Sequence, residues 1–410
     1  MCAISLDVGT SSIKIAVIDV EGKVLFHKRV FFTTILTASS LYDYFIRGLE
    51  EAISYCAVNN FNPLGISVSG NGPSIVSVSK FGRADDVLLM WNDGFCEMLP
   101  NSLSIFAPRL NLFKKKYKAS YDSSLFFLPL VEYLLFRLGG EPITLLPEKR
   151  FAPFYWKETD LKAIDFDRNL LLPFVDLGHK VGYYKNIPLF AGPPDYVAAL
   201  IGTNTLEDLS ACDIAGSSEG INISVEKKPK NVPSNVRLMP SVIPNLWTVA
   251  TLFNDTGIRF SNAVKKLKYK FKSNDLEEKF KEVMEVISEC YYLNKEIEEV
   301  NGDFVEVYNI VIDILNSLKA SFENLEKITG FSGSYAVSGG HAKNDLYINM
   351  KSFVTKKTFI LLNHADAELL GNAIIVFYKS GVYPSLKEAA KETIKVSRIW
   401  KGANTPYAFS

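Results

Sequence analysis

One stretch near the N-terminus is the starting point for predicting the fold: Ile4-Ser5-Leu6-Asp7-Val8-Gly9-Thr10-Ser11-Ser12-Ile13-Lys14-Ile15-Ala16-Val17-Ile18-Asp19. It contains an apolar run, a turn of small residues and a second run with alternating apolar side chains, which predicts a β-hairpin. Backbone N–H groups and hydroxyls of such a turn can bind phosphate oxygens. Asp7, at the strand end, is placed to hold a metal ion directly or through water. An ordinary hairpin explains the stretch by itself equally well.

Length and composition limit the class of protein. A chain of 410 residues predicts two or three domains. Its 45 basic and 45 acidic side chains give a formal net charge of zero. A balanced charge argues against nucleic-acid binding by bulk electrostatics.

Cysteines and apolar stretches predict the compartment. Five scattered cysteines without a CxxC pair favour free thiols in a reducing compartment, and the four dispersed histidines suggest no zinc site. The chain enters a strand almost at once, so we expect no signal peptide. The longest apolar stretch, 125–138, is predicted to be a helix and is too short to span a membrane. We therefore expect a cytoplasmic protein without membrane contact.

Polar loops follow several predicted strands of the first half. Gly70-Asn71-Gly72 follows the strand 64–69, and Trp91-Asn92-Asp93-Gly94 follows the segment 87–90. Strand ends of this kind predict an open α/β sheet with its site at the carboxyl edge.

A further carboxylate stands where a strand gives way to a helix. After the strand 188–191 come Gly192-Pro193-Pro194-Asp195 and a helix from Tyr196. Prolines suit the first turn of a helix, so Asp195 is expected near the positive end of the helix dipole. Its alternative role is that of a helix cap.

The opening pattern recurs in the second half. Asp213-Ile214-Ala215-Gly216-Ser217-Ser218 again combines an acidic strand end with a small-residue turn, and a returning strand follows. A third strand, 335–338, ends in Gly339-Gly340-His341-Ala342-Lys343-Asn344, whose glycines allow a ligand close to the backbone. Because each copy of the hairpin begins about half of the chain, the pattern predicts a duplicated phosphate-binding domain.

Together these motifs resemble the FGGY carbohydrate kinases. The motifs are Asp7 to Ser12, Gly65-Ile66-Ser67 with Gly70-Asn71-Gly72, Trp91 to Gly94, Gly192 to Asp195, Ala215 to Ser218, Gly339 to Asn344 and Ala367 to Ala373. The resemblance implies an α/β fold of two actin-like (ribonuclease H-like) domains with a ligand cleft between them. Residues 1–205 would bind sugar and supply the first phosphate loop and the catalytic base. Residues 206–410 would supply the second phosphate loop and bind adenosine.

The resemblance also implies roles for individual residues. Asp195 would be the general base, and Asp7 would lie near Mg²⁺. ATP and its phosphates would contact Gly9, Thr10, Ser11, Ser12, Gly216, Ser217, Ser218, Gly339, Gly340 and Asn344, and the sugar would contact Asn71, Trp91, Asp93 and Asp195. For Trp91, packing in the core is the alternative.

The implied activity is the phosphorylation of a sugar or polyol hydroxyl by Mg-ATP, with a pentulose favoured. Xylulokinases usually carry Met-His, and glycerol kinases Arg-Glu, where this chain has Gly70-Asn71. The chain is also shorter than typical members between Trp91 and Asp195, in the region that shapes the sugar pocket. One alternative is a catalytically impaired sensor that binds sugar or nucleotide, and another is an actin- or chaperone-like ATPase. A small-molecule substrate is the expected partner, and a homodimer is left open.

Overall fold

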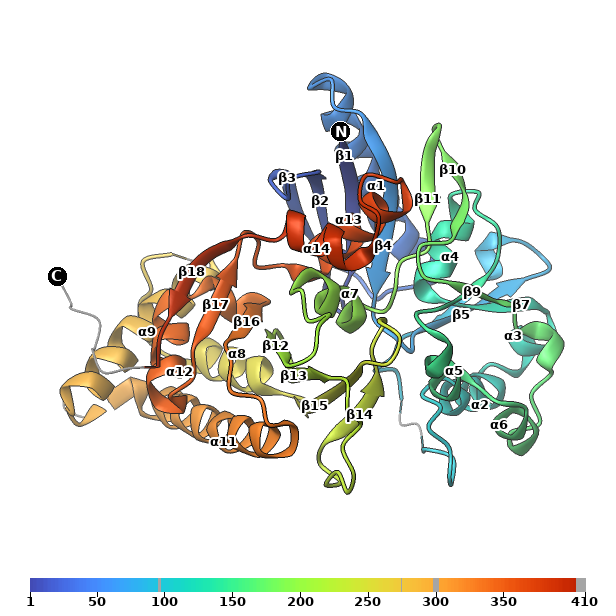
Figure 1. The fold of residues 1–410 in the computed structure, drawn as a ribbon. Coiled ribbons are helices and arrows are strands. Elements are labelled where there is room, and N and C mark those ends of the chain that lie inside the picture. Colours follow the sequence, from blue (N-terminus) through green and yellow to red (C-terminus); the bar gives the residue numbers. More distant parts are fainter. Residues whose placement is uncertain (95–96, 274, 298–301, 403–410) are drawn as a thin grey trace. The chain divides into compact units, whose positions relative to one another are not determined.

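The computed structural model describes residues 1–94, 97–273, 275–297 and 302–402, which form two compact units (Figure 1). Unit 1 comprises Met1–Gly202, Val242–Pro244 and Glu368–Ile394. Unit 2 comprises Thr203–Ser241, Asn245–Ala367 and Lys395–Ser410. The first break falls near the expected boundary after residue 205. Residues 368–394, which were expected in the second domain, instead belong to unit 1.

Unit 1 is built on a six-stranded sheet in the order β10-β11-β4-β1-β2-β3. The predicted hairpin forms: β1 and β2 are antiparallel, and β3 continues the meander. β4 lies parallel to β1, and β11 lies parallel to β4. Because parallel strands end at the same edge, the residues after β1, β4 and β11 come together there. The strands are β1 (Cys2–Val8), β2 (Ser12–Asp19), β3 (Val24–Phe31), β4 (Pro63–Gly70), β10 (Lys180–Tyr184) and β11 (Ile187–Phe190).

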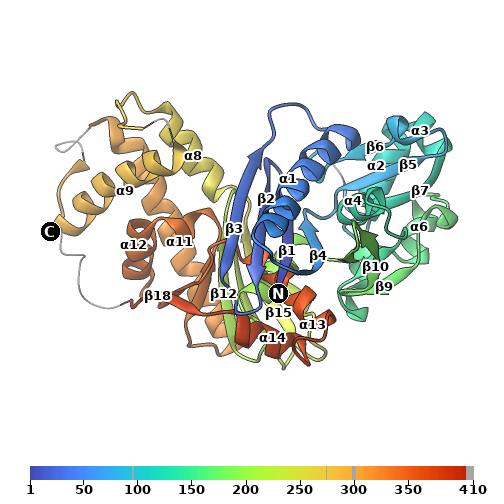
Figure 2. The same ribbon diagram turned by 90° about the horizontal axis from the view of Figure 1, so that it is seen from above.

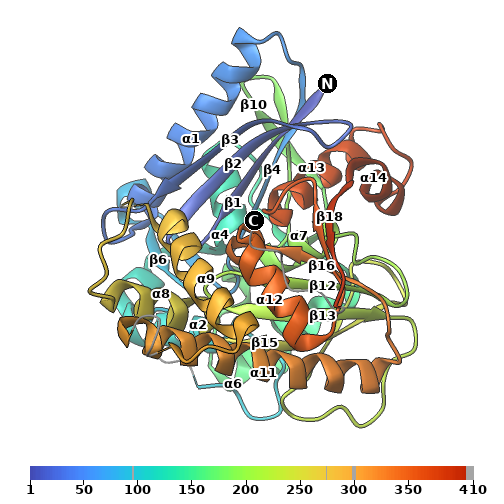
Figure 3. The ribbon, with the colours of Figure 1, turned by 90° about the vertical axis from the view of Figure 1, so that its left-hand side faces the viewer.

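Helices cover both faces of this sheet (Figure 3). α1 (Ala38–Val58) buries an apolar stripe against side chains such as Ile4 and Val17. α13 (Ala367–Lys379) packs against Ala3, Ala16 and Ile18, which point to the opposite face because side chains alternate along a strand. This packing explains why the C-terminal segment belongs to unit 1. The main fold of this unit also contains α7 (Asp195–Gly202) and α14 (Leu386–Thr393).

A smaller subdomain with a three-stranded sheet, β6-β5-β7, is inserted after β4 and lies at the right of Figure 2. Here the prediction of one helix over 125–138 is wrong in its first part, because Ser124–Pro129 forms β7 and only Leu130–Arg137 forms α4. Pro129 disfavours the helical conformation of Leu128, and β7 pairs with β5. The other elements are β5 (Ile75–Ser79), β6 (Val87–Leu89), α2 (Ala107–Lys116), α3 (Lys118–Asp122), β8 (Thr144–Leu146), α5 (Ala152–Tyr155), α6 (Glu158–Ala163) and β9 (Phe174–Asp176).

Unit 2 repeats the core arrangement of unit 1. Its sheet has the order β14-β15-β13-β12-β16-β17-β18. β12 and β13 form an antiparallel hairpin, β15 extends it, and β16 lies parallel to β12, as β4 lies parallel to β1. The repeated sequence motif therefore corresponds to a repeated structural unit, a β-hairpin with a parallel strand beside it. The strands are β12 (Ser210–Ala215), β13 (Glu219–Val225), β14 (Arg237–Pro240), β15 (Trp247–Phe253), β16 (Tyr335–Ser338), β17 (Phe359–Leu362) and β18 (Val396–Trp400).

Four long helices complete the described part of unit 2: α8 (Thr256–Lys266), α9 (Leu276–Leu293), α11 (Val305–Thr329) and α12 (Asp345–Thr355). α11 buries Val311, Leu315, Leu318 and Phe322 in the core, which confirms that its apolar stripe serves packing. Cys2, Cys56, Cys212 and Cys290 are buried free thiols, as predicted, whereas Cys96 lies outside the described residues. Among the helices described, none has the length and apolar character needed to cross a bilayer.

Candidate active site

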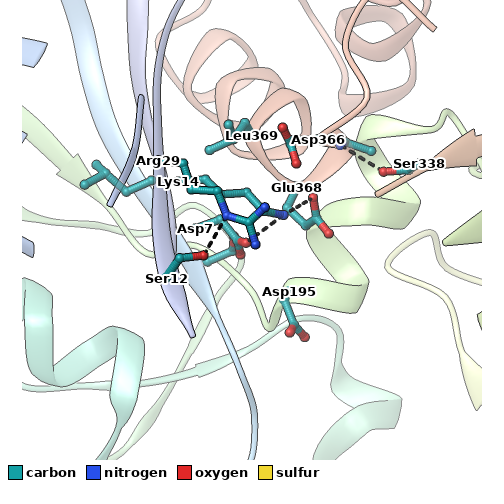
Figure 4. Close-up of polar contacts among 12 residues, drawn as sticks. Asp7, Ser12, Lys14, Arg29, Asp195, Ser338, Asp366, Glu368 and Leu369 are labelled. Atoms are coloured by element: carbon teal, nitrogen blue, oxygen red, sulfur yellow. Dashed lines mark hydrogen bonds and ion pairs between the residues drawn. The ribbon is translucent and has the colours of Figure 1, made fainter. Parts of the chain in front are cut away.

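Asp7 is the next-to-last residue of β1, at the carboxyl edge of the unit 1 sheet, and is almost fully buried. Ser69 Oγ donates a 2.8 Å hydrogen bond to its Oδ1, and Lys14 Nζ lies 3.5 Å from its Oδ2. The hairpin register places Asp7 directly opposite Lys14. Lys14 Nζ also lies 3.4 Å from Oε2 of Glu368, in the first turn of α13 (Figure 4). The expected metal-binding carboxylate is thus part of an ion-pair network.

Asn372 supports this network from α13. Its Nδ2 donates to Ser69 Oγ at 2.9 Å and to the Leu6 carbonyl at 2.8 Å. Since Ser69 in turn donates to Asp7, a continuous chain of hydrogen bonds runs from α13 to the Asp7 carboxylate.

The first predicted phosphate loop forms a tight turn after β1. Gly9 N–H donates to the Ser12 carbonyl at 2.9 Å, and Thr10 and Ser11 are exposed at the tip. Ser12 is buried, and its Oγ accepts a 2.9 Å hydrogen bond from Arg29 Nε. The accessible groups of the loop are therefore those of Gly9, Thr10 and Ser11.

Asp195 is the first residue of α7, and its Oδ1 accepts a 2.7 Å hydrogen bond from the Tyr196 N–H. The preceding turn packs tightly on β4: a Cβ at Gly192 would lie 2.0 Å from the Val68 carbonyl oxygen, so only glycine fits. Pro194 forms a β-bridge with Gly70. The carboxylate is thereby held at the same sheet edge as Asp7.

The surroundings of Asp195 change its acidity. Burial raises its pKa to about 7, and the negative charges of Asp7 and Glu368 act in the same direction. The Tyr196 N–H and the Lys14 ammonium oppose the rise in pKa. The carboxylates of Asp7 and Glu368 offer hard oxygen ligands of the kind that Mg²⁺ prefers.

Two residues of the predicted sugar loops meet at Thr10. Trp91 Nε1 donates to Thr10 Oγ1 at 3.0 Å, and Asn71 Nδ2 lies 3.5 Å from the same oxygen. Trp91 is 42% exposed, so it is not a core residue. Asn71 is buried, and its Oδ1 has no hydrogen-bond partner among the described residues.

Asp93 lies in the same loop as Trp91, and its carboxylate forms a hydrogen bond within that loop. Asp93 Oδ2 accepts a 2.8 Å hydrogen bond from Met90 N–H. Arg109, on α2, donates to the carbonyls of Asp93 at 2.7 Å and Met90 at 3.3 Å. Asp93 and Arg109 together therefore fix the loop that presents Trp91.

A cavity of about 20 Å³, the size of one water molecule, lies beside Asn71 and Pro194. Glu132 lines it, and burial raises the pKa of this carboxyl to about 7. Glu132 Oε1 accepts a 2.9 Å hydrogen bond from Leu145 N–H. No motif in the sequence marks Glu132.

In unit 2 the second predicted phosphate loop repeats the tight turn. Gly216 N–H donates to the Ser218 carbonyl at 2.7 Å, and Gly216 and Ser217 are exposed. The N–H groups of Gly257 and Ile258 in α8 donate to the Ser217 carbonyl at 3.1 and 3.3 Å. The helix N-terminus therefore braces this loop from one side.

The predicted adenosine residues follow β16. Gly339 has φ = 92°, and a Cβ there would lie 2.2 Å from the Ala215 carbonyl oxygen, so glycine is required on both grounds. Gly340 is exposed. Asn344 caps α12, since its Oδ1 accepts a 3.0 Å hydrogen bond from Tyr347 N–H.

The prediction from sequence missed Lys14 and Glu368 as members of the site. Lys14 could have been found from the hairpin, because a symmetrical turn between Val8 and Ile13 puts it opposite Asp7. Glu368 lies in the motif Ala367 to Ala373, but its contact with Lys14 could not be predicted, since that motif was assigned to the other domain.

Both units contain a β-hairpin with a small-residue turn and a parallel strand beside it. This is the fold that the motifs predicted from their resemblance to carbohydrate kinases. Comparison with solved structures confirms this fold. Xylulose kinase from Lactobacillus acidophilus is 17% identical with a TM-score of 0.75, and Plasmodium falciparum glycerol kinase with ADP is 13% identical with a TM-score of 0.77. Gluconate kinase from Lactobacillus acidophilus is 17% identical with a TM-score of 0.73. Each comparison covers 98% of this chain and 94% of the other.

The chain is also similar in sequence to a curated protein. Xylulose kinase from Staphylococcus epidermidis (strain ATCC 12228 / FDA PCI 1200) is 21% identical over 472 residues, covering 98% of this chain and 92% of the relative. No protein-family model matches the chain. The likenesses in sequence and structure agree with the resemblance that the motifs indicated.

Proposed function

We propose that the chain is a sugar kinase that transfers phosphate from ATP to a sugar hydroxyl, with Asp195 as general base. One observation carries the proposal: Asp195 stands at the start of α7, at the sheet edge that bears Asp7 and the first loop, with its pKa raised to about 7. A base works best when its pKa lies near the operating pH. The relatives named xylulose, gluconate and glycerol kinase support the class of reaction.

In this proposal Asp195 accepts the proton of the sugar hydroxyl as that oxygen attacks the γ-phosphorus. The bond from the γ-phosphorus to the bridging oxygen breaks, and ADP leaves with the electron pair. Gly9, Thr10 and Ser11 bind phosphate oxygens from unit 1, with Ser12 behind them. Gly216, Ser217 and Ser218 bind them from unit 2, and Gly339, Gly340 and Asn344 contact adenosine.

Asp7 would hold Mg²⁺, directly or through water, and Glu368 offers a further carboxylate nearby. The metal, when bound, offsets the negative charge of the phosphates. Lys14 orients the Asp7 carboxylate, because the ammonium lies 3.5 Å from Asp7 Oδ2.

Asn71, Trp91 and Asp93 would form the sugar side, with Asp93 acting through the loop that it closes. We favour a pentulose as substrate because two of the named relatives are xylulose kinases. We also propose a cytoplasmic location. That the chain forms a homodimer is a prediction from the sequence.

The test is a panel of ketoses, aldoses and polyols incubated with the full chain and Mg-ATP, with ADP release as the readout. We expect a pentulose to stimulate ADP release, and Asp195→Asn to abolish the stimulation. Equal activity in Asp195→Asn would contradict the assigned base. Thermal stabilisation by a sugar without any ADP release would identify the chain as a sensor instead.

A further inference from the structure

A fully buried lysine lies in unit 2, beneath the turn of the second predicted phosphate loop. Lys351 on α12 is 0% exposed, and its ammonium forms ion pairs with the carboxylates of Asp213 and Glu219. The rings of Phe322 and Phe359 lie 5.8 and 5.3 Å from its Nζ. A lysine is almost never buried to this degree without charged partners, so the two carboxylates account for its position.

Both partners flank the loop. Asp213 is on β12, before Gly216, and Glu219 begins β13 directly after Ser218. The hairpin register pairs Asp213 with Ile221 and Ala215 with Glu219, which puts both carboxylates on one face of the sheet. A single ammonium therefore joins the two arms of the hairpin next to its turn.

Lys351 is the link between the two carboxyl groups of this cluster. Burial raises the pKa of Asp213 to about 7. Asp213 Oδ1 and Glu219 Oε2 have no hydrogen-bond partner within the described part of the chain. His341 Nδ1 lies 3.8 Å from Glu219 Oε2, but burial lowers the pKa of His341 to about 4, so this ring is neutral at pH 7. The ammonium of Lys351 therefore makes the ion pairs that join Asp213 to Glu219 at the base of the loop.

Unit 1 pairs its corresponding carboxylate with a lysine from a different element. There Lys14 on β2 lies opposite Asp7, whereas in unit 2 the residue opposite Asp213 is Ile221. The lysine of unit 2 comes from helix α12 instead. Asp7 and Asp213 thus each have a lysine partner, although the two lysines lie on different elements, β2 and α12. This indicates that the ion pair has a role in supporting the neighbouring loop.

We propose that Lys351 is a positioning residue for the second phosphate loop: its ammonium binds the carboxyl groups of Asp213 and Glu219 and so holds the two arms of the hairpin together next to the turn. The inference rests on the proposed function, because it takes Gly216–Ser218 as a phosphate loop. Lys351 acts through the hairpin and touches no substrate.

The experiment compares the affinities of the full chain for ATP and adenosine by calorimetry, with Lys351→Met as the first variant. Loss of the ammonium removes the ion pairs that join Asp213 and Glu219 beside the loop. We expect the Kd for ATP to rise about tenfold or more, because the loop is then no longer held in position to bind phosphate, while the Kd for adenosine stays unchanged. Equal loss of both affinities, or loss of thermal stability alone, would overturn the inference.

Two further variants keep the test decisive if Lys351→Met does not fold. Glu219→Gln retains the Lys351–Asp213 pair but loses the ion pair to the second arm of the hairpin, so the Kd for ATP should rise about two- to fivefold with adenosine unchanged. The triple variant Lys351→Met, Asp213→Asn, Glu219→Gln buries no charge but lacks both ion pairs, and we expect it to fold and to bind ATP more weakly than the wild type with adenosine unchanged. A wild-type ATP affinity in either folded variant would overturn the inference.

A matched control is Lys357→Met. Lys357 forms an ion pair with Glu326, which also accepts a hydrogen bond from Tyr335 at the start of β16, away from the loop. This variant should lose stability without changing the ratio of ATP to adenosine affinity. If the wild-type chain prefers ATP over adenosine but no sugar stimulates ADP release, the proposed function fails while the role of Lys351 stands. If the wild-type chain shows no such preference, the loop binds no phosphate and the role of Lys351 fails as well.

Discussion

The indole N–H of Trp91 donates a 3.0 Å hydrogen bond to the hydroxyl oxygen of Thr10. This bond joins the loop that we assign to the sugar with the loop that we assign to the phosphates. Asn71, at 3.5 Å from the same oxygen, adds a second link. The two loops are therefore connected within unit 1 through one side chain, and a change in either should affect the other.

We predict that Trp91→Phe and Thr10→Val are coupled in their effect on the KM for sugar. Each variant removes one partner of the same hydrogen bond, so the double variant should lose less than the sum, with a coupling energy of about 1 kcal/mol. A double-mutant cycle of sugar kinetics measures this energy. Thr10→Ser keeps the hydroxyl and serves as the control. Strict additivity would show that the bond has no role in sugar binding.

Asp195→Asn should lower kcat by roughly 10²- to 10⁴-fold, the usual contribution of a general base. The KM for sugar should change little, because an amide of the same shape remains. Asp43→Asn is the matched control, since Asp43 is an exposed residue of α1. It should retain most of kcat. Steady-state kinetics with the best sugar of the panel distinguish the two variants.

The same substitution should stabilise the protein at neutral pH. The pKa of Asp195 is raised in the folded state to about 7, so its contribution to stability is present below its unfolded pKa of about 3.8 and is lost as the pH rises through 7. Asp195→Asn removes this loss. Its melting temperature should therefore exceed that of the wild type more at pH 8 than at pH 4. An equal difference at both values would contradict the raised pKa.

The activity should depend on pH through the same group. Asp195 must be ionised to accept a proton, so kcat/KM should rise about tenfold per pH unit below pH 7 and level off above it. A profile of kcat/KM from pH 5 to 9 checks this. Rates that stay constant down to pH 5 would exclude a base with a raised pKa.

Lys14 and Glu368 should move this profile in opposite directions. The Lys14 ammonium lowers the pKa of Asp195, and the Glu368 carboxylate raises it. Lys14→Met should therefore shift the profile to higher pH, and Glu368→Gln should shift it to lower pH. Lys14→Arg, which keeps the positive charge, is the control for Lys14→Met. Shifts of the same sign in the two variants would refute this electrostatic account.

Local patterns were sufficient to predict the hairpins and their loops. Asp7 to Ser12 and Asp213 to Ser218 combine alternation with a small-residue turn, so both hairpins form as expected. The strand, the turn at Gly192 and the helix at Asp195 were also predicted, because glycine, proline and a carboxylate each act on the backbone nearby. These features depend on neighbours in the sequence.

Features that depend on distant residues could not be predicted in this way. The ion pair of Lys351 with Asp213 and Glu219 joins a helix to a hairpin far along the chain. The contact of Glu368 with Lys14 requires that α13 return to the first unit. The apolar run at 125–138 fits a helix by its periodicity, but pairing with β5 makes its first part a strand.

The return of α13 has a consequence for how the protein is made. Ser5 on β1 donates a hydrogen bond to the Leu369 carbonyl, and Ala3 and Ala16 are covered by Leu369, Leu370 and Ala373. During translation, one face of the first sheet therefore remains uncovered until residues 367–379 have left the ribosome. Exposed apolar surface of this kind attracts chaperones and promotes aggregation. Unit 1 is thus completed only after the strands β12 to β17 of unit 2 have been synthesised.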